Sequence, residues 1–130
     1  MPYHVLVVED NDPIFELFEI VLTRAGFRLS RARTGGEAIA STEGLDPDLV
    51  LLDVGLPDMD GIDLMIRLKS DPGTSHLPFV CVSGHATAED AARALEAGSV
   101  QYLTKPINTR TLAQELLDLL EALRRPGTLQ

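Results

Sequence analysis

The chain has 130 residues, 45% of them hydrophobic and 24% charged, so it can form one globular domain with a single core and is not a disordered chain. Its one cysteine excludes a disulfide scaffold. A net charge of −9 at pH 7, with no secretory leader and no apolar run of membrane-spanning length, argues against direct nucleic-acid binding and membrane insertion and predicts a cytoplasmic protein.

Apolar runs and amphipathic segments alternate along the whole sequence. Short apolar runs bounded by polar residues are typical of strands buried on both faces of a parallel sheet. The ten expected elements, in chain order, are a strand at 5–8, a helix at 12–25, a strand at 27–32, a helix at 35–43, a strand at 49–52, a helix at 61–70, a strand at 79–82, a helix at 87–97, a strand at 100–103 and a helix from about 109 to 123.

The first helix is expected to begin at Asp12, whose carboxylate can accept the unpaired N–H groups of the first turn, and to stop at Gly26. Pro13 suits the first turn because no N–H is needed there. Five apolar residues are predicted to form the inward face of this helix: Ile14, Leu17, Phe18, Val21 and Ala25.

The later elements differ in how much they can bury. The strand at 27–32 alternates apolar and polar residues, which predicts an edge strand with one face in water. The helix at 87–97 is rich in alanine and offers little apolar area. The last helix is expected to turn five leucines inward: Leu112, Leu116, Leu119, Leu120 and Leu123.

Five consecutive strand and helix pairs define a (βα)5 chain, and right-handed crossovers place the helices on both faces of one parallel sheet. The predicted class is therefore α/β, a doubly wound sheet with the flavodoxin-like strand order 2-1-3-4-5. This order places the half-polar second strand and the mixed fifth strand at the two edges. Ligands of such sheets bind beyond the carboxyl ends of the strands, in the gap between strands one and three.

Four of the five strands finish on ionisable or hydroxyl residues. These are Glu9 and Asp10 after the first strand, Asp53 after the third, Ser83 after the fourth and Lys105 after the fifth. Parallel strands bring all of them to one edge of the sheet, where three carboxylates together need a cation or a proton. Oxygen ligands without His or Cys favour a hard ion, and few carboxylates with a phosphoryl oxygen suit Mg²⁺ better than Ca²⁺.

Asp53 stands alone after the central apolar run and is the predicted nucleophile, because an aspartate carboxylate can attack phosphorus and form an acyl phosphate. Lys105 would pair with the phosphoryl oxygens, and the Ser83 hydroxyl would donate to one of them. Three nearby acids are expected to serve as a helix cap and as turn residues: Asp12, Asp58 and Asp60.

Six short segments carry further motifs. They are 5–11 (VLVVEDN), 47–53 (PDLVLLD), 56–61 (LPDMDG), 82–84 (VSG), 97–98 (AG) and 102–106 (YLTKP). Together they resemble the receiver domain of two-component response regulators over residues 4–124. The resemblance implies a receiver domain at 1–124 followed by a C-terminal tail at 125–130.

The resemblance implies that Asp53 accepts a phosphoryl group from a histidine kinase or a histidine phosphotransfer protein. It also implies Mg²⁺ as the cofactor, bound by Asp10, Asp53 and the backbone carbonyl of Gly55, with Glu9 acting through a water. Glu9 stands where aspartate is commoner, and the site is expected to survive its extra methylene. The peptide bond between Lys105 and Pro106 resembles the family's cis bond, which would aim the lysine inward.

The resemblance further implies how the signal leaves the site. Ser83 would move toward the phosphoryl group, and Tyr102 would rotate into the space that this opens. The fourth helix, fifth strand and fifth helix would form the output face, which can bind a downstream protein or pair with a second copy as a homodimer. Such a domain phosphorylates and dephosphorylates itself but is not an enzyme that turns over an external substrate.

Three other classes share parts of the pattern. A pseudo-receiver would keep the fold and act as a phosphorylation-independent interaction module. A phosphatase of the haloacid dehalogenase type also places an aspartate after an apolar strand, but it needs a second aspartate where Gly55 stands. A flavin carrier of flavodoxin shape needs a Ser/Thr/Gly-rich phosphate loop after the first strand, and the sequence there is EDNDP.

Overall fold

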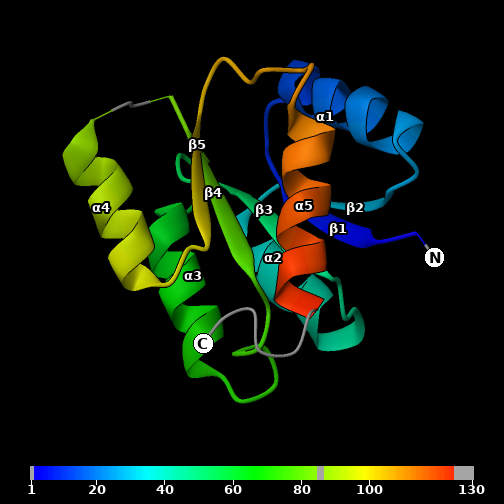
Figure 1. The fold of residues 1–130 in the computed structure, drawn as a ribbon. Helices are drawn as coiled ribbons and strands as arrows, with labels where there is room; N and C mark the ends of the chain where they lie inside the picture. The colour runs from blue at the N-terminus through cyan, green and yellow to red at the C-terminus, as the bar shows by residue number, and fades with distance from the viewer. Residues whose placement is uncertain (1, 85–86, 125–130) are drawn as a thin grey trace.

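The computed structural model describes residues 2–84 and 87–124, which form an alternating series of strands and helices (Figure 1). The elements are β1 His4–Val8, α1 Asp12–Arg24, β2 Arg28–Ala32, α2 Gly35–Gly44, β3 Leu49–Asp53, α3 Gly61–Ser70, β4 Phe79–Ser83, α4 Ala88–Ala97, β5 Gln101–Thr104 and α5 Leu112–Arg124. The strands are parallel and lie in the order β2-β1-β3-β4-β5, which confirms the predicted topology. The tail predicted at 125–130 lies outside the described residues.

The sheet separates two hydrophobic cores, with α1 and α5 on one face and α2, α3 and α4 on the other (Figure 1). Along β1, Val5 and Val7 pack toward α1 and α5, whereas Leu6 and Val8 pack toward the opposite layer. This division follows because successive side chains of a strand point to opposite faces. Among the described residues, no helix is long and apolar enough to cross a membrane.

The start of α1 differs from the sequence prediction. Asn11 is the N-cap, because its side chain accepts a hydrogen bond from the Ile14 N–H at 2.9 Å. The prediction of Asp12 as the cap is therefore wrong. Asp12 is the first helical residue instead, and its carboxylate pairs with the guanidinium groups of Arg31 and Arg33, each at 2.8 Å. These two arginines hold the pKa of Asp12 below its usual value.

The inward face of α1 is also rotated from the prediction. Its buried residues are Phe15, Phe18 and Leu22, which recur at the spacing expected of one helical face. Of the residues predicted to point inward, only Phe18 is fully buried, and Leu17 is 39% exposed. The sequence IFELFEIVL carries apolar residues on more than one helical face, so packing against the sheet selects which face is buried.

Gly61, the first residue of α3, lies against the backbone at the end of β3. Its N–H donates to the Val54 carbonyl at 2.8 Å, and an added Cβ would lie 2.8 Å from Val54 Cα and closer still to the Asp53 carbonyl oxygen. Because these neighbours are backbone atoms, they cannot move aside cheaply. Gly61 is therefore needed for α3 to begin directly beside Asp53.

Replacing Gly61 with alanine is expected to lower the free energy of unfolding by about 1–3 kcal/mol, as is typical of overpacking. Gly44→Ala is the matched control, since nothing lies within 4 Å of a Cβ at Gly44 and alanine favours the helix there. Urea denaturation measures both variants. Equal effects at the two positions would contradict the contact between Gly61 and β3.

Candidate functional site

Four strands deliver polar side chains to one end of the sheet. Asp53 and Ser83 are the last residues of β3 and β4, Glu9 and Asp10 follow β1, and Lys105 follows β5. In the register of the sheet, Ser83 lies one residue beyond the level of Asp53. The parallel topology therefore brings the sequence-predicted residues to a common edge.

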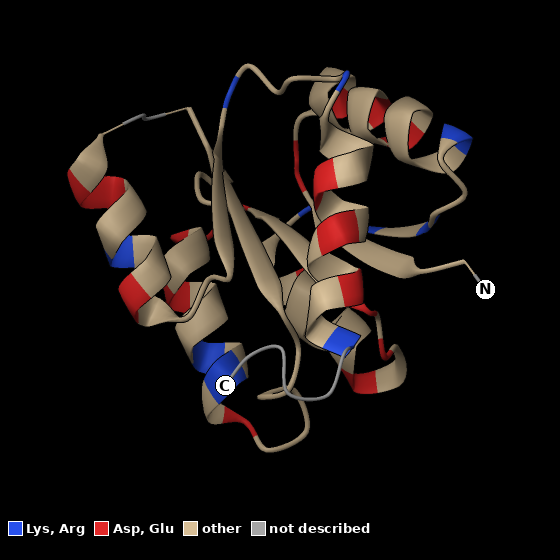
Figure 2. Cartoon of the chain, in the orientation of Figure 1, with Lys and Arg blue, Asp and Glu red and all other residues tan. Residues whose placement is uncertain are grey.

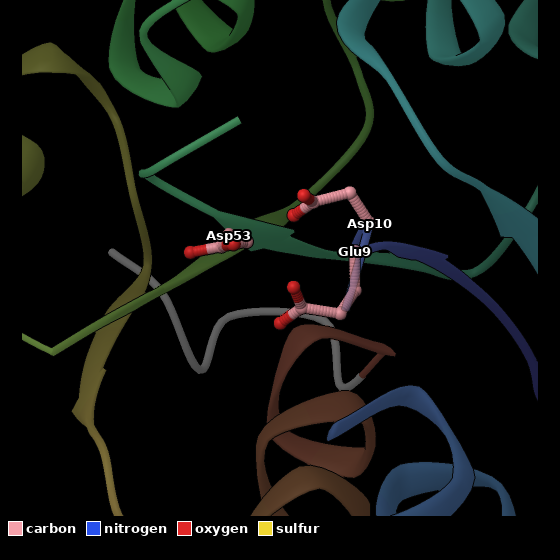
Figure 3. Close-up of side chains that lie close together, drawn as sticks. All are labelled: Glu9, Asp10 and Asp53. Atoms are coloured by element: carbon pink, nitrogen blue, oxygen red, sulfur yellow. The ribbon is translucent and has the colours of Figure 1, made fainter. Parts of the chain in front are cut away.

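The three acids form one cluster (Figure 3). Carboxylate oxygens of Glu9, Asp10 and Asp53 lie within 4.8 Å of one another. Glu9 is 1% exposed and Asp53 is 7% exposed, whereas Asp10 lies at the surface. Carboxylates about 4 Å apart repel by about 4 kcal/mol per pair at an effective dielectric of about 20, so the cluster requires a proton or a cation.

Lys105 supplies one cation to this cluster. Its Nζ lies 3.2 Å from Glu9 Oε1 and 3.4 Å from Asp53 Oδ1, and its side chain is 22% exposed. The peptide bond from Lys105 to Pro106 is cis. The Lys105 N–H donates to the Ser83 carbonyl at 2.8 Å, which ties the start of the following loop to the end of β4.

Backbone N–H groups hold two of the carboxylates. The Asn11 N–H donates to Glu9 Oε2 at 3.2 Å, and the Gly55 N–H donates to Asp53 Oδ1 at 3.1 Å. Each bond joins a carboxylate to the N–H two residues further along the chain, so each carboxylate is oriented by its own loop. Asp53 Oδ1 accepts from the Gly55 N–H and also pairs with Lys105.

The crowding of the carboxylates affects the protonation of Glu9. Burial, followed by the charge of Asp53, raises the pKa of Glu9 to about 7. Within the described part of the chain, Glu9 Oε1 is a buried oxygen that makes no hydrogen bond, and it forms an ion pair with Lys105. A buried carboxylate oxygen without a hydrogen bond, inside a cluster of oxygen donors, fits a hard divalent cation such as Mg²⁺.

The two predicted switch residues are Ser83, which ends β4 at the edge of this site, and Tyr102, which lies in β5 two residues before the end of that strand. Ser83 is 4% exposed, and Tyr102 is partly buried against the core that lies between the sheet and α2, α3 and α4. Tyr102 belongs to β5 and pairs in register with Cys81 of β4. Cys81 is buried, and burial raises the pKa of its thiol, as expected of an inert core cysteine.

Two predicted turn residues have a more specific role. Asp60 is the N-cap of α3 and accepts from the Ile62 N–H at 2.7 Å. Asp58 accepts from the N–H groups of Gly35 and Gly36 at 2.8 and 3.0 Å, so it binds the loop after Asp53 to the start of α2. These N–H groups hold the pKa of Asp58 below its usual value.

The sequence did not single out Arg31, whose guanidinium lies beside the loop that carries Glu9 and Asp10. The available signal was its place near the end of a predicted edge strand, next to the first strand in the predicted order. Polar residues on an edge strand are common, however, so this signal alone does not distinguish Arg31 from the neighbouring arginines.

An aspartate at the end of a central strand, two further acids and a lysine thus meet at the carboxyl edge of a (βα)5 sheet. Residues 5–117 match the family model of the response regulator receiver domain. The chain belongs to this family of two-component signalling proteins. Receiver domains are phospho-accepting signalling switches and not enzymes that turn over external substrates.

Individual relatives agree with this assignment. The chain is 34% identical over 108 residues to the polar-differentiation response regulator DivK of Brucella anthropi, covering 83% of this chain and 88% of DivK. It is 37% identical over 127 residues to the probable transcriptional regulatory protein TcrX of Mycobacterium tuberculosis, covering 97% of this chain and 52% of TcrX, so it spans about half of that relative.

A solved structure is similar over nearly the whole chain. The CheY-like response regulator receiver domain protein from Methanospirillum hungatei superposes with a TM-score of 0.87 at 28% sequence identity. The alignment covers 98% of this chain and all of the other. The flavodoxin-like fold class is therefore confirmed.

Proposed function

We propose that Asp53 accepts a phosphoryl group from the phosphohistidine of a histidine kinase or a histidine phosphotransfer protein. The observation that carries this proposal is the position of Asp53 Oδ1, 3.4 Å from Lys105 Nζ within the acidic cluster. In the transfer, an Asp53 oxygen bonds to phosphorus as the phosphorus–nitrogen bond breaks. The electron pair of that bond leaves with the imidazole, which departs neutral because its other nitrogen carries a proton.

The neighbouring groups have distinct roles in this proposal. Lys105 pairs with the phosphoryl oxygens, the Ser83 hydroxyl donates to one of them, and the Gly55 N–H keeps Asp53 oriented. Mg²⁺ would be held by Asp10, Asp53 and the Gly55 carbonyl, with Glu9 acting through a water. When bound, the metal neutralises negative charge on the phosphoryl group as it approaches three carboxylates.

The phosphorylated domain signals through the face formed by α4, β5 and α5. Phosphorylation adds about −1.5 to −2 charges beside Ser83, which draws the Ser83 hydroxyl inward and lets Tyr102 rotate. The only fully buried residue of α4 is Ala94, so little apolar area opposes a shift of this helix. Leu95, 50% exposed, and Val100, 39% exposed, suit a downstream protein target or a second copy of the chain in a homodimer.

The charge distribution supports a protein partner rather than a nucleic acid. Acidic residues lie along α1, α4 and α5 (Figure 2), and the net charge is −9. We also propose that the protein is cytoplasmic and consists of a receiver domain at 1–124 with a tail at 125–130. It acts as a switch that loses its own phosphoryl group, without turnover of an external substrate.

Incubation with acetyl phosphate and Mg²⁺ is expected to add one phosphoryl group to the wild type and none to Asp53→Asn, as measured by intact mass. Asp63→Asn, which removes an exposed carboxylate of α3, is the control and should label like the wild type. Chelation of the metal should suppress labelling. Equal labelling of Asp53→Asn would reject Asp53 as the acceptor, and no labelling of any variant would favour the pseudo-receiver.

A further inference from the structure

Arg31 lies on the edge strand β2, yet its side chain is only 18% exposed. Its guanidinium lies over the ring of Phe15, with Cζ 4.4 Å from the ring centre. Its Nε donates to the Glu9 carbonyl at 3.1 Å, and its Nη2 donates to the Asp10 carbonyl at 3.3 Å. Nη2 also lies 2.8 Å from the Asp12 carboxylate, so one side chain contacts two residues of the loop after β1 and the first residue of α1.

The peptide units of the two acids are therefore held from the edge strand. The Glu9 N–H donates to the carbonyl of Ala32 in β2 at 3.0 Å. Arg31, the residue before Ala32, binds the Glu9 carbonyl through its side chain. The Asp10 carbonyl is bound by the same guanidinium. Arg31 thus fixes the backbone to which the Glu9 and Asp10 side chains are attached. Movement of its guanidinium would therefore move both carboxylates.

We propose that Arg31 is a positioning residue of the Mg²⁺ site, which orders Glu9 and Asp10 before the metal binds. This inference rests on the proposed function, since it concerns the same pocket. Groups that orient metal ligands without touching the metal commonly control its affinity. A loop that is already ordered also loses less conformational freedom on binding.

The contact requires the shape of arginine as well as its charge. The planar guanidinium presents Nε and Nη2 to two neighbouring carbonyls at once. A lysine at position 31 would keep the positive charge, but its single ammonium cannot reproduce this paired geometry.

The two effects of Arg31 on a cation have opposite signs. Its positive charge repels Mg²⁺, so charge alone predicts that Arg31→Met binds the metal more tightly than the wild type. Positioning predicts weaker binding, because the acids lose their fixed backbone. The sign of the change in Mg²⁺ dissociation constant therefore separates the two roles.

Arg33 offers a matched control for the test. Its Nη1 lies 2.8 Å from the same Asp12 oxygen, but the side chain is 52% exposed and, among the described residues, makes no hydrogen bond to the carbonyls of Glu9 or Asp10. Arg33→Met thus removes one positive charge and one Asp12 contact while leaving the positioning bonds intact.

Calorimetric titration with Mg²⁺ is expected to show about tenfold weaker binding for both Arg31→Met and Arg31→Lys. Arg33→Met should stay within about twofold of the wild type, as expected for an exposed charge. Hydrogen exchange of the amides at 9–12 in metal-free protein should accelerate in the Arg31 variants and not in Arg33→Met. Circular dichroism checks the fold, and the lysine variant carries the test should the methionine variant not fold.

Unchanged or tighter binding in Arg31→Met, wild-type affinity in Arg31→Lys, or equal weakening in Arg33→Met would overturn the positioning role. The outcome for the proposed function is separate. If the wild type binds Mg²⁺ and labels with acetyl phosphate while the Arg31 variants keep their affinity, only the role of Arg31 fails. If the wild type neither binds Mg²⁺ nor labels, the proposed function fails first.

Discussion

Replacing Lys105 with methionine is expected to destabilise the metal-free protein at pH 8 by about 1–3 kcal/mol and to tighten Mg²⁺ binding about tenfold. Lys105 Nζ lies 3.2 Å from Glu9 Oε1 and 3.4 Å from Asp53 Oδ1, so its loss leaves the acidic cluster without this cation. The stability cost lies below that of a fully buried pair because the lysine is 22% exposed. Mg²⁺ binds more tightly because it no longer competes with an ammonium group for the same oxygens.

Urea denaturation with and without saturating Mg²⁺ measures the first effect, and calorimetric titration measures the second. Arg110→Met removes an exposed cation from the segment between β5 and α5 and should change neither quantity appreciably. Weaker Mg²⁺ binding in Lys105→Met would show that the lysine orders the acids more than it competes with the metal. In that case Lys105 and Arg31 would act in the same direction, although both carry positive charge.

The sheet, and the edge of it where the site lies, could be predicted because both depend on patterns that are visible in the sequence itself. Apolar runs of four fix where strands lie, and the parallel topology then sends every strand end to the same side. Glu9, Asp53 and Ser83 each follow such a run directly, and Lys105 follows the mixed fifth strand. Their meeting at one edge therefore needs no knowledge of side-chain conformation.

Features that depend on the phase of a helix could not be predicted in the same way. Asn11 and Asp12 are both good cap residues, and the helix they precede carries apolar residues on more than one face. Packing against the sheet buries Phe15, whose ring lies under the Arg31 guanidinium. Because the buried face of α1 was predicted wrongly, this contact beside the functional site could not be predicted either.

Contacts between distant side chains form the second unpredicted group. Asp58 binds the N–H groups at the start of α2, and Arg31 binds carbonyls of the loop after β1, across separations of 21 to 23 residues. Neither contact leaves a periodic pattern in the sequence, because each involves one polar residue in a loop or an edge strand. Such contacts become visible only when the register between neighbouring strands is known.

Replacing Glu9 with glutamine is expected to stabilise the metal-free protein at pH 8 and to leave its stability at pH 5 nearly unchanged. Burial and the Asp53 charge raise the pKa of Glu9 from 4.5 to about 7 in the folded protein. The folded state therefore favours protonated Glu9, and this contribution to stability is complete below pH 4.5 and is lost as the pH rises through 7. At pH 8 the wild type carries a cost of up to about 3 kcal/mol that glutamine avoids.

With Mg²⁺ bound, the wild type should be more stable than Glu9→Gln at pH 8, because the metal stabilises the deprotonated Glu9 carboxylate that the metal-free fold disfavours. The rise in the thermal midpoint on adding Mg²⁺ is expected to grow from pH 5 to pH 8 in the wild type and to be smaller and nearly constant in Glu9→Gln. Glu16→Gln, an exposed change of the same charge on α1, should follow the wild type at every pH. A difference between wild type and Glu9→Gln that stays flat over this range would mean that another group takes up the proton.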